Sequence, residues 1–169
     1  MRPYCMLALL SGSLALVLLL VALSTDNWIA SVGHNNQAHS GLWHLEQESV
    51  KDFIWATRVF TILAALAGLL SISCLIVFII PSLSNSSFSH LASLIFCITA
   101  FVAVLCSTVG MAVYTGERWR ESGHSQIQTF FAWSFYMGWT SVLLFLFTGV
   151  LSLGVHQGTP RPNYETFSA

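Results

Sequence analysis

Residues 59–80 read VFTILAALAGLLSISCLIVFII and form an uninterrupted apolar stretch between Arg58 and Pro81. The stretch contains no Asp, Glu, Lys, Arg or His. A helix needs about 20 apolar residues to cross the hydrocarbon core of a bilayer, which is about 30 Å thick. Because a backbone in lipid must satisfy its own polar groups, such a stretch adopts a helix there. We therefore predict a transmembrane helix over residues 59–80.

Three more stretches of the same kind lie at residues 6–25, 91–115 and 130–155. Each is long enough to span a bilayer, and none contains an acidic, basic or histidine residue. The sequence therefore predicts four transmembrane helices.

Four spans place both termini on one side of the membrane and two larger loops, residues 26–57 and 116–129, on the other. The tail, residues 156–169, then lies on the side of the N-terminus. The termini carry fewer Lys and Arg residues than the larger loops do, which taken alone would place the termini outside. The run after Arg2 also resembles a cleavable signal peptide, although its apolar core exceeds the usual length of about 7–15 residues. We expect one membrane domain over residues 1–169.

The composition agrees with a membrane protein. Of the 169 residues, 55% are hydrophobic and 8% are charged, and the mean hydropathy is +0.72. A soluble domain carries charge on about a quarter of its residues. This excludes a disordered tail, a nucleic-acid binder and an ordinary cytosolic enzyme. The net charge of −1 implies no polyanionic partner.

The sequence gives catalysis little support. Proton relays and ion paths need ionisable residues inside the membrane, and the four apolar stretches contain no acid, base or histidine. A haem between helices needs facing histidines, and the nearest candidate, His90, has no partner in the sequence pattern. No phosphate-binding glycine loop or nucleophile–base pair is present. We therefore predict a protein that is not an enzyme and needs no cofactor.

The first larger loop alternates apolar and polar residues in two places. On this basis residues 29–32 and 42–45 are predicted as short strands, with a turn at residues 34–37 between them. Two strands alone are marginally stable, so this hairpin needs further strands or a membrane surface beside it.

Trp28 followed by Gly41, Leu42 and Trp43 resembles the Trp…Gly-Leu-Trp signature of a superfamily of membrane proteins. This superfamily comprises claudins, peripheral myelin protein, epithelial membrane proteins and lens membrane protein. Arg58 resembles the basic residue at which the next family segment ends. The likeness covers almost the whole chain, because residues 112–116 and 131–139 resemble the ends of the third and fourth family helices.

The resemblance implies an all-α, claudin-like membrane protein. It would have a left-handed four-helix bundle, cytosolic termini, and a small antiparallel β-sheet made from both larger loops on the extracellular or lumenal side. Claudins carry a disulfide-forming cysteine pair after Gly-Leu-Trp, and this chain departs from them there. Its cysteines are Cys5, Cys74, Cys97 and Cys106, all at or within predicted helices. We therefore expect no disulfide in the sheet layer, and we regard Cys5 as a candidate for palmitoylation.

Three segments resemble the granule-protein branch of this family, namely residues 38–43, 126–131 and 161–166. The resemblance implies a protein of lysosome-related cytotoxic granules in lymphocytes, which supports their trafficking and exocytosis and reaches the plasma membrane on fusion. Other integral membrane proteins would be its partners in the bilayer. Two alternatives stay open: a claudin-like adhesion or barrier protein at cell contacts, and an accessory subunit of a channel or proton pump.

The tail carries a pattern of the kind that clathrin adaptors bind as an extended peptide. Tyr164 and Phe167 stand at its tyrosine and bulky apolar positions. Pro160 and Pro162 keep the segment out of a helix, and Tyr164 lies nine residues past Val155. A four-residue motif is weak by itself, so the predicted sorting signal rests on its position, its extended context and the family resemblance.

His34, His39 and His44 are evenly spaced in the first larger loop. Strand periodicity places His39 on the face opposite the other two, which argues against a shared metal ion. With Arg58, the larger loops hold six acidic and four basic side chains, so protonation of these histidines and His124 changes their charge from −2 to +2. Because histidine titrates between about pH 5 and 8, we predict a pH-responsive lumenal face. Merely solvated loop histidines are the alternative.

Small residues recur at packing intervals within the apolar stretches, in the pairs Ala64 and Gly68, Ala100 and Ala103, and Gly138 and Ser141. Such residues let transmembrane helices approach closely. We expect them to pack within one bundle, with a homo-oligomer interface as the alternative. The glycosylation sequon at Asn85 lies in the short loop beside the termini, so cytosolic termini predict that it carries no sugar.

Overall fold

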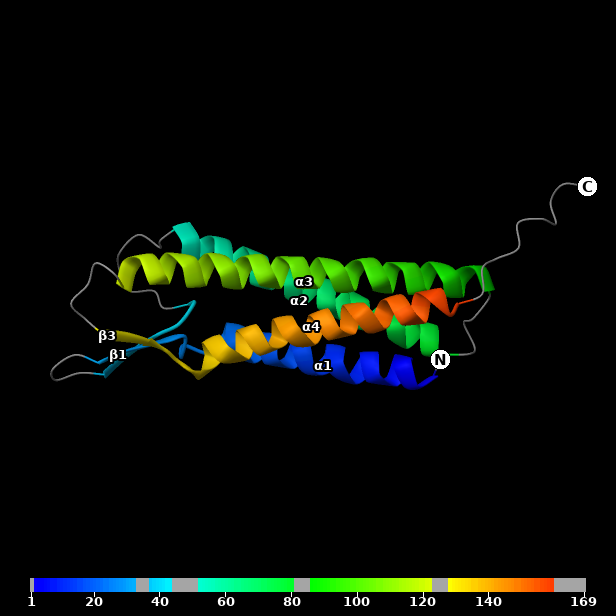
Figure 1. Cartoon of the computed structure of the whole chain (residues 1–169), viewed down its shortest axis with the longest axis horizontal. Coiled ribbons are helices and arrows are strands. Elements are labelled where there is room, and N and C mark those ends of the chain that lie inside the picture. Colours follow the sequence, from blue (N-terminus) through cyan, green and yellow to red (C-terminus); the bar gives the residue numbers. More distant parts are fainter. Residues whose placement is uncertain (1, 33–36, 44–51, 81–85, 123–127, 160–169) are drawn as a thin grey trace, which may run out of the picture.

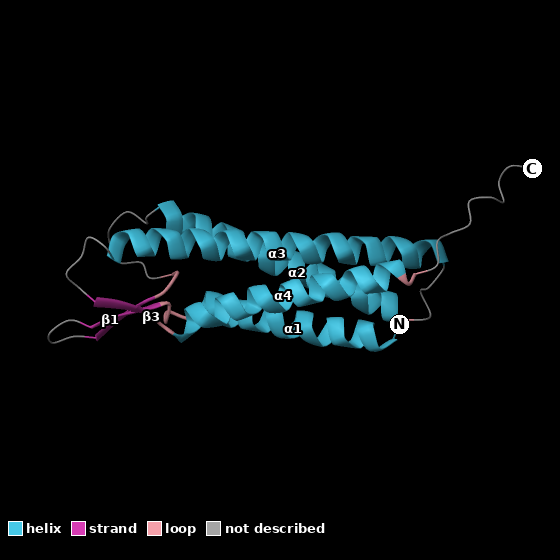
Figure 2. Ribbon diagram, in the orientation of Figure 1, coloured by secondary structure: helices cyan, strands magenta, loops and turns pink. Residues whose placement is uncertain are grey.

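The computed structural model describes residues 2–32, 37–43, 52–80, 86–122 and 128–159. Four long helices lie side by side, and a small sheet extends from one end of the bundle (Figures 1 and 2). The helices are α1 (Arg2–Ser24), α2 (Asp52–Ile79), α3 (Ser86–Ser122) and α4 (Trp133–Gln157). Each is long and apolar enough to cross a membrane, which confirms the four predicted spans. We call the end with the sheet the sheet end, and the opposite end, where α1 begins and α4 ends, the termini end.

Two helices extend well beyond their apolar stretches. Helix α2 begins at Asp52 rather than at residue 59, and α3 runs from Ser86 to Ser122 rather than over residues 91–115. At 1.5 Å per residue α3 is about 55 Å long, whereas the hydrocarbon core is about 30 Å thick. Hydropathy marks only the part of a helix that lies in lipid. The predicted loop at residues 116–129 is therefore helical over its first part.

Helix α4, by contrast, begins later than predicted. Phe130 and Phe131 were expected at its start, but they belong to strand β3 (Gln128–Phe131), and the helix begins at Trp133. An apolar run does not distinguish a strand end from a helix start when the two are adjacent. Phe131 packs against the buried core at the sheet end, which accounts for its apolar character outside the helix.

The sheet joins the two larger loops, as the family resemblance implies. Strands β1 (Ile29–Val32), β2 (Gln37–Ser40) and β3 form three antiparallel strands in the order β2-β1-β3. Ile29 lies opposite Ser40 on one side and Phe131 on the other. The predicted strand at residues 29–32 is confirmed.

The second predicted strand, at residues 42–45, is wrong where the structure describes it. Leu42 and Trp43 lie in a turn after β2, and residues 44 and 45 fall outside the described residues. The alternation of apolar residues here has another cause. Leu42 is buried in the bundle core, while Trp43 caps a helix end, as shown below.

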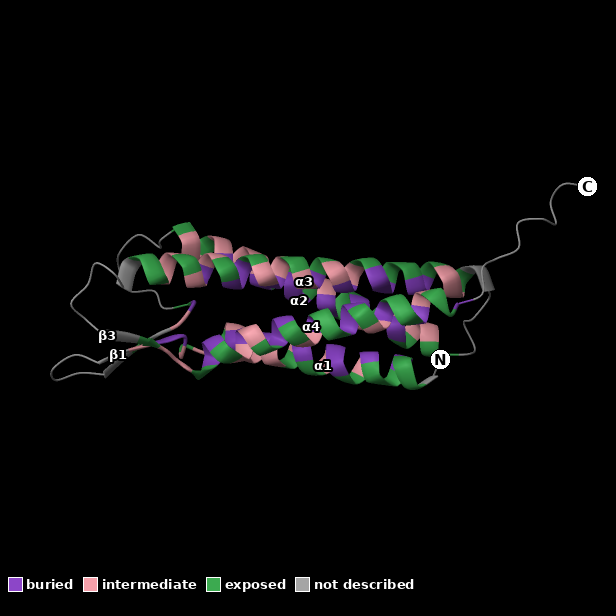
Figure 3. Cartoon of the chain, in the orientation of Figure 1, coloured by how far each residue is buried: buried purple, intermediate pink, exposed green. Residues whose placement is uncertain are grey.

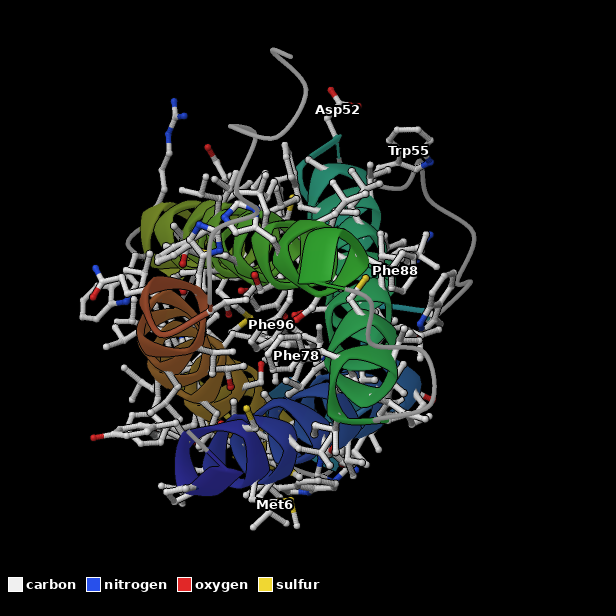
Figure 4. All side chains as sticks on the ribbon, turned by 90° about the vertical axis from the view of Figure 1, so that its right-hand side faces the viewer. Met6, Asp52, Trp55, Phe78, Phe88 and Phe96 are labelled. Atoms are coloured by element: carbon white, nitrogen blue, oxygen red, sulfur yellow. The ribbon has the colours of Figure 1, made fainter. Side chains whose placement is uncertain are left out.

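Buried residues line the inside of the bundle and exposed residues cover its outside (Figure 3). Seen along the bundle, Phe96 and Phe78 point to the interior, whereas Met6 and Trp55 point outward (Figure 4). The exposed surface of the helices is largely leucine, isoleucine, valine and phenylalanine, as lipid contact requires.

The small residues singled out in the sequence are buried between the helices. A Cβ atom added at Gly138 would lie 2.8 Å from Met111, and one at Gly68 would lie 2.9 Å from Phe145. These residues therefore serve packing within one bundle, as predicted.

Buried hydroxyl groups link neighbouring helices. Ser11 Oγ lies 2.8 Å from Thr148 Oγ1 between α1 and α4, and Thr57 Oγ1 donates to the Gly110 carbonyl over 3.3 Å between α2 and α3. Such bonds add to helix association where lipid supplies no hydrophobic driving force.

Candidate functional site

The indole of Trp28 closes the end of α1. This residue lies four positions after the last residue of the helix and is 1% exposed. Its Nε1 donates a hydrogen bond of 2.7 Å to the Ala22 carbonyl, and its ring meets Tyr114 edge-on with centroids 4.8 Å apart. The last four carbonyl groups of a helix have no partner within the helix. Trp28 therefore caps α1 and joins it to α3.

A second indole caps the next carbonyl of the same helix. Trp43 Nε1 donates to the Leu23 carbonyl over 2.7 Å, and Thr25 Oγ1 donates to the Val21 carbonyl over 2.8 Å. With the bond from Trp28 to Ala22, three consecutive carbonyl groups at the end of α1 accept side-chain hydrogen bonds. The family tryptophans thus satisfy backbone groups that would otherwise be left unpaired near the membrane surface.

Gly41 lets the chain pass close to the end of α1. A Cβ atom at this position would lie 2.3 Å from the Asp26 Cα atom, a backbone atom that cannot rotate away. The next residue, Leu42, is completely buried in the core at the sheet end. Glycine at position 41 is therefore a steric requirement, and it places Leu42 and Trp43 in their sites.

Arg58 reaches this turn from α2. Its Nε donates to the Leu42 carbonyl over 2.5 Å, and its guanidinium carbon lies 4.9 Å from the centre of the Trp43 ring. One side chain thus fixes both the turn and the capping indole. The five residues Trp28, Gly41, Leu42, Trp43 and Arg58, which we call the signature cluster, tie α1 and α2 to the loop between them.

Sequence reasoning missed the aromatic and basic residues beside this cluster. Tyr114 is buried between Trp28 and Phe53, with ring centroids 4.8 and 6.3 Å away. The Arg118 guanidinium carbon lies 5.4 Å from the Phe53 ring and 5.6 Å from the Tyr114 ring. The motif at residues 112–116 contains Tyr114 and was the available signal. These contacts couple α3 to the same core.

The sequence of the chain matches a known family. The sequence profile of the PMP-22/EMP/MP20/Claudin family matches residues 4–152. The chain belongs to this family. Human Protein NKG7 is 50% identical over 161 residues, which are 95% of this chain and 96% of that protein. Mouse Protein NKG7 is 51% identical over 167 residues, 98% of this chain and 99% of that protein. Human lens fiber membrane intrinsic protein is 32% identical over 166 residues, 86% of this chain and 91% of that protein.

These findings confirm the predicted resemblance to the claudin superfamily. In this claudin-family chain the sheet layer has no disulfide, because all four cysteines are free and lie in helices. Hydrogen bonds and ring contacts of the signature cluster hold the layer instead.

The predicted histidine face of this family member is described only at His39. That residue lies in β2 opposite Ala30 and is exposed. His34, His44 and His124 lie outside the described residues, as do Asn85 and the tail with Tyr164 and Phe167. Within the described part of the chain, no three His, Cys, Asp or Glu side chains come together as a metal site.

Cys5 lies at the termini end, as predicted, but it faces the bundle. The residue is 5% exposed and packs in a cluster with Ala8, Leu75, Phe96 and Val155. A palmitoyl chain on this sulfur would have to leave the helix interior to reach lipid. The placement therefore argues against the predicted palmitoylation.

His90 was expected to have no partner, and the structure corrects this. Its ring lies against that of His156, with centroids 5.0 Å apart. The pairing arises because α3 begins at Ser86 and α4 continues to Gln157, so both helices extend past their predicted ends at this side.

Proposed function

We propose that this protein is a non-enzymatic membrane scaffold of lysosome-related cytotoxic granules in lymphocytes, where it supports granule trafficking and exocytosis. The resemblance to the granule-protein branch of the family carries the proposal. Identity of 50% with human Protein NKG7, over nearly the full length of both chains, supports that resemblance.

The interior of the bundle supports a scaffold rather than a catalyst or an ion path. Every buried polar residue of the described helices is Ser or Thr, and hydroxyls such as those of Ser11 and Thr148 bond to each other between helices. Functional intramembrane sites are usually marked by ionisable residues. On this proposal other membrane proteins bind to the lipid-facing surface of the bundle, and the hydrogen bonds of its interior stabilise the fold.

The tail is proposed to carry the protein to the granule. Helix α4 ends at Gln157, and Tyr164 follows seven residues later, in a sequence whose Pro160 and Pro162 disfavour a helix. A clathrin adaptor would bind Tyr164 and Phe167 in separate pockets. The sheet end would then face the granule lumen, where His34, His39, His44 and His124 would respond to acid, and it would become extracellular on fusion.

The test is the steady-state location of the tagged full-length protein in cytotoxic lymphocytes. We expect the wild type in acidic granules and Tyr164→Ala at the cell surface. Glu165→Ala is the matched control, because it removes a neighbouring tail side chain and keeps both signal residues. Location of wild type and Tyr164→Ala alike at cell contacts would overturn the proposal and favour an adhesion or barrier protein.

A further inference from the structure

The two histidines at the termini end face each other across the helix interface. His90 comes from the first part of α3 and His156 from the last turn of α4. Their ring planes are inclined by 53°, so the rings are not stacked face to face. Both residues are half-buried and remain accessible to solution. The helix segments beneath them are fixed, because Phe96 of α3, which points to the interior in Figure 4, is buried in one cluster with Val155 of α4.

The hydroxyl of Ser93 contacts both histidines. Ser93 Oγ donates its one proton to the His90 carbonyl over 2.8 Å. It also lies 3.0 Å from His156 Nδ1, within hydrogen-bond distance. When Nδ1 carries the proton and donates it to this hydroxyl, Nε2 of the neutral ring has a free lone pair. Ser93 is 1% exposed, and its hydroxyl is thus a fixed positioning group of the kind that orients metal-binding histidines.

The separation of the rings fits a shared metal ion. Zinc binds imidazole nitrogen at about 2.0–2.1 Å, and the ring centre lies about 3 Å from the ion. Two imidazoles at a tetrahedral angle therefore have centroids about 5 Å apart. The observed centroid separation of 5.0 Å matches that distance.

We propose that His90 and His156 form a binding site for a divalent transition-metal ion such as Zn²⁺, and that Ser93 positions His156. Water would complete the coordination, since no third metal-binding side chain joins the pair in the described structure. The ion would fasten the start of α3 to the end of α4. This proposal is independent of the granule function.

The test is a titration of the full-length protein, purified in detergent with its affinity tag removed, by Zn²⁺ in a calorimeter. We expect one ion per chain at this site and no binding of Mg²⁺, which prefers oxygen ligands. His90→Gln and His156→Gln should each abolish this binding. Ser93→Ala should weaken it about tenfold or more, as loss of a positioning group does. His39→Gln is the matched control, since it removes an exposed histidine at the sheet end.

The outcomes separate this site from other histidines of the chain. Zinc held at the sheet end would be lost in His39→Gln and kept in His90→Gln and His156→Gln, which would overturn the proposal. Absence of zinc binding by the wild type would also overturn it. Zinc should raise the unfolding temperature of wild type and His39→Gln alike. Unchanged affinity in Ser93→Ala, which keeps both imidazoles, would refute the positioning role.

Discussion

Gly41 is the member of the signature cluster with the least steric freedom. Because an added Cβ would lie 2.3 Å from the Asp26 Cα atom, Gly41→Ala must displace the turn and with it the indole of Trp43. We expect a loss of about 1–3 kcal/mol in unfolding free energy, the usual cost of overpacking. Thermal unfolding in detergent measures it. Gly116→Ala, at a helical site with nothing within 4 Å, should unfold at or above the wild-type temperature. Equal effects of the two substitutions would contradict the steric argument.

Arg58 serves the cluster through its shape as well as its charge. A lysine keeps the charge but cannot both donate to the Leu42 carbonyl in the same geometry and place a planar guanidinium over the Trp43 ring. We expect Arg58→Lys to lower the unfolding free energy by about 1–3 kcal/mol, the cost of an unpaired buried acceptor. Arg120→Lys is the control, because that side chain is exposed and makes a surface contact of 4.0 Å to Glu117. Comparable stability of the two variants, measured by thermal unfolding, would show that charge alone suffices at position 58.

At the scale of elements, the sequence specifies the spans better than their ends. Residues 59–80 identify a membrane helix without any other information, because the bilayer sets the required length and polarity. The extension of α2 back to Asp52 contains the charged residues Asp52 and Arg58, so the uninterrupted apolar run does not include it. Phe130 and Phe131 show the opposite error, because the apolar run assigned them to α4 although they belong to β3. Phe131 is apolar because it packs against the buried core at the sheet end, whereas Phe130 is exposed. A single apolar run does not separate such a strand end from the helix that follows it.

For the whole molecule, the sequence predicts which residues matter but not how they meet. The signature residues were found from their resemblance to a family pattern. That Trp28 and Trp43 cap α1 is visible only in the structure, which also shows the turn at Gly41 and the bond from Arg58 to the Leu42 carbonyl. The pair of His90 and His156 was missed for the same reason. Residues 66 positions apart come together only through the packing of α3 on α4.

The orientation of the whole molecule follows from the fold once one loop is located. The sheet end and the loop containing Asn85 lie on opposite sides of the membrane, because β1 and β2 follow α1 whereas Asn85 lies between α2 and α3. Gln37→Ser creates a sequon at Asn35 in the loop at the sheet end. If the termini are cytosolic, this variant should gain one glycan in cells, and the wild type should carry none at Asn85. Glycosidase treatment and gel mobility measure the difference, with Gln37→Ala as the control that lacks the sequon. A glycan on wild-type Asn85 that Asn85→Gln removes would reverse the orientation, and it would place Tyr164 beyond the reach of any cytosolic adaptor.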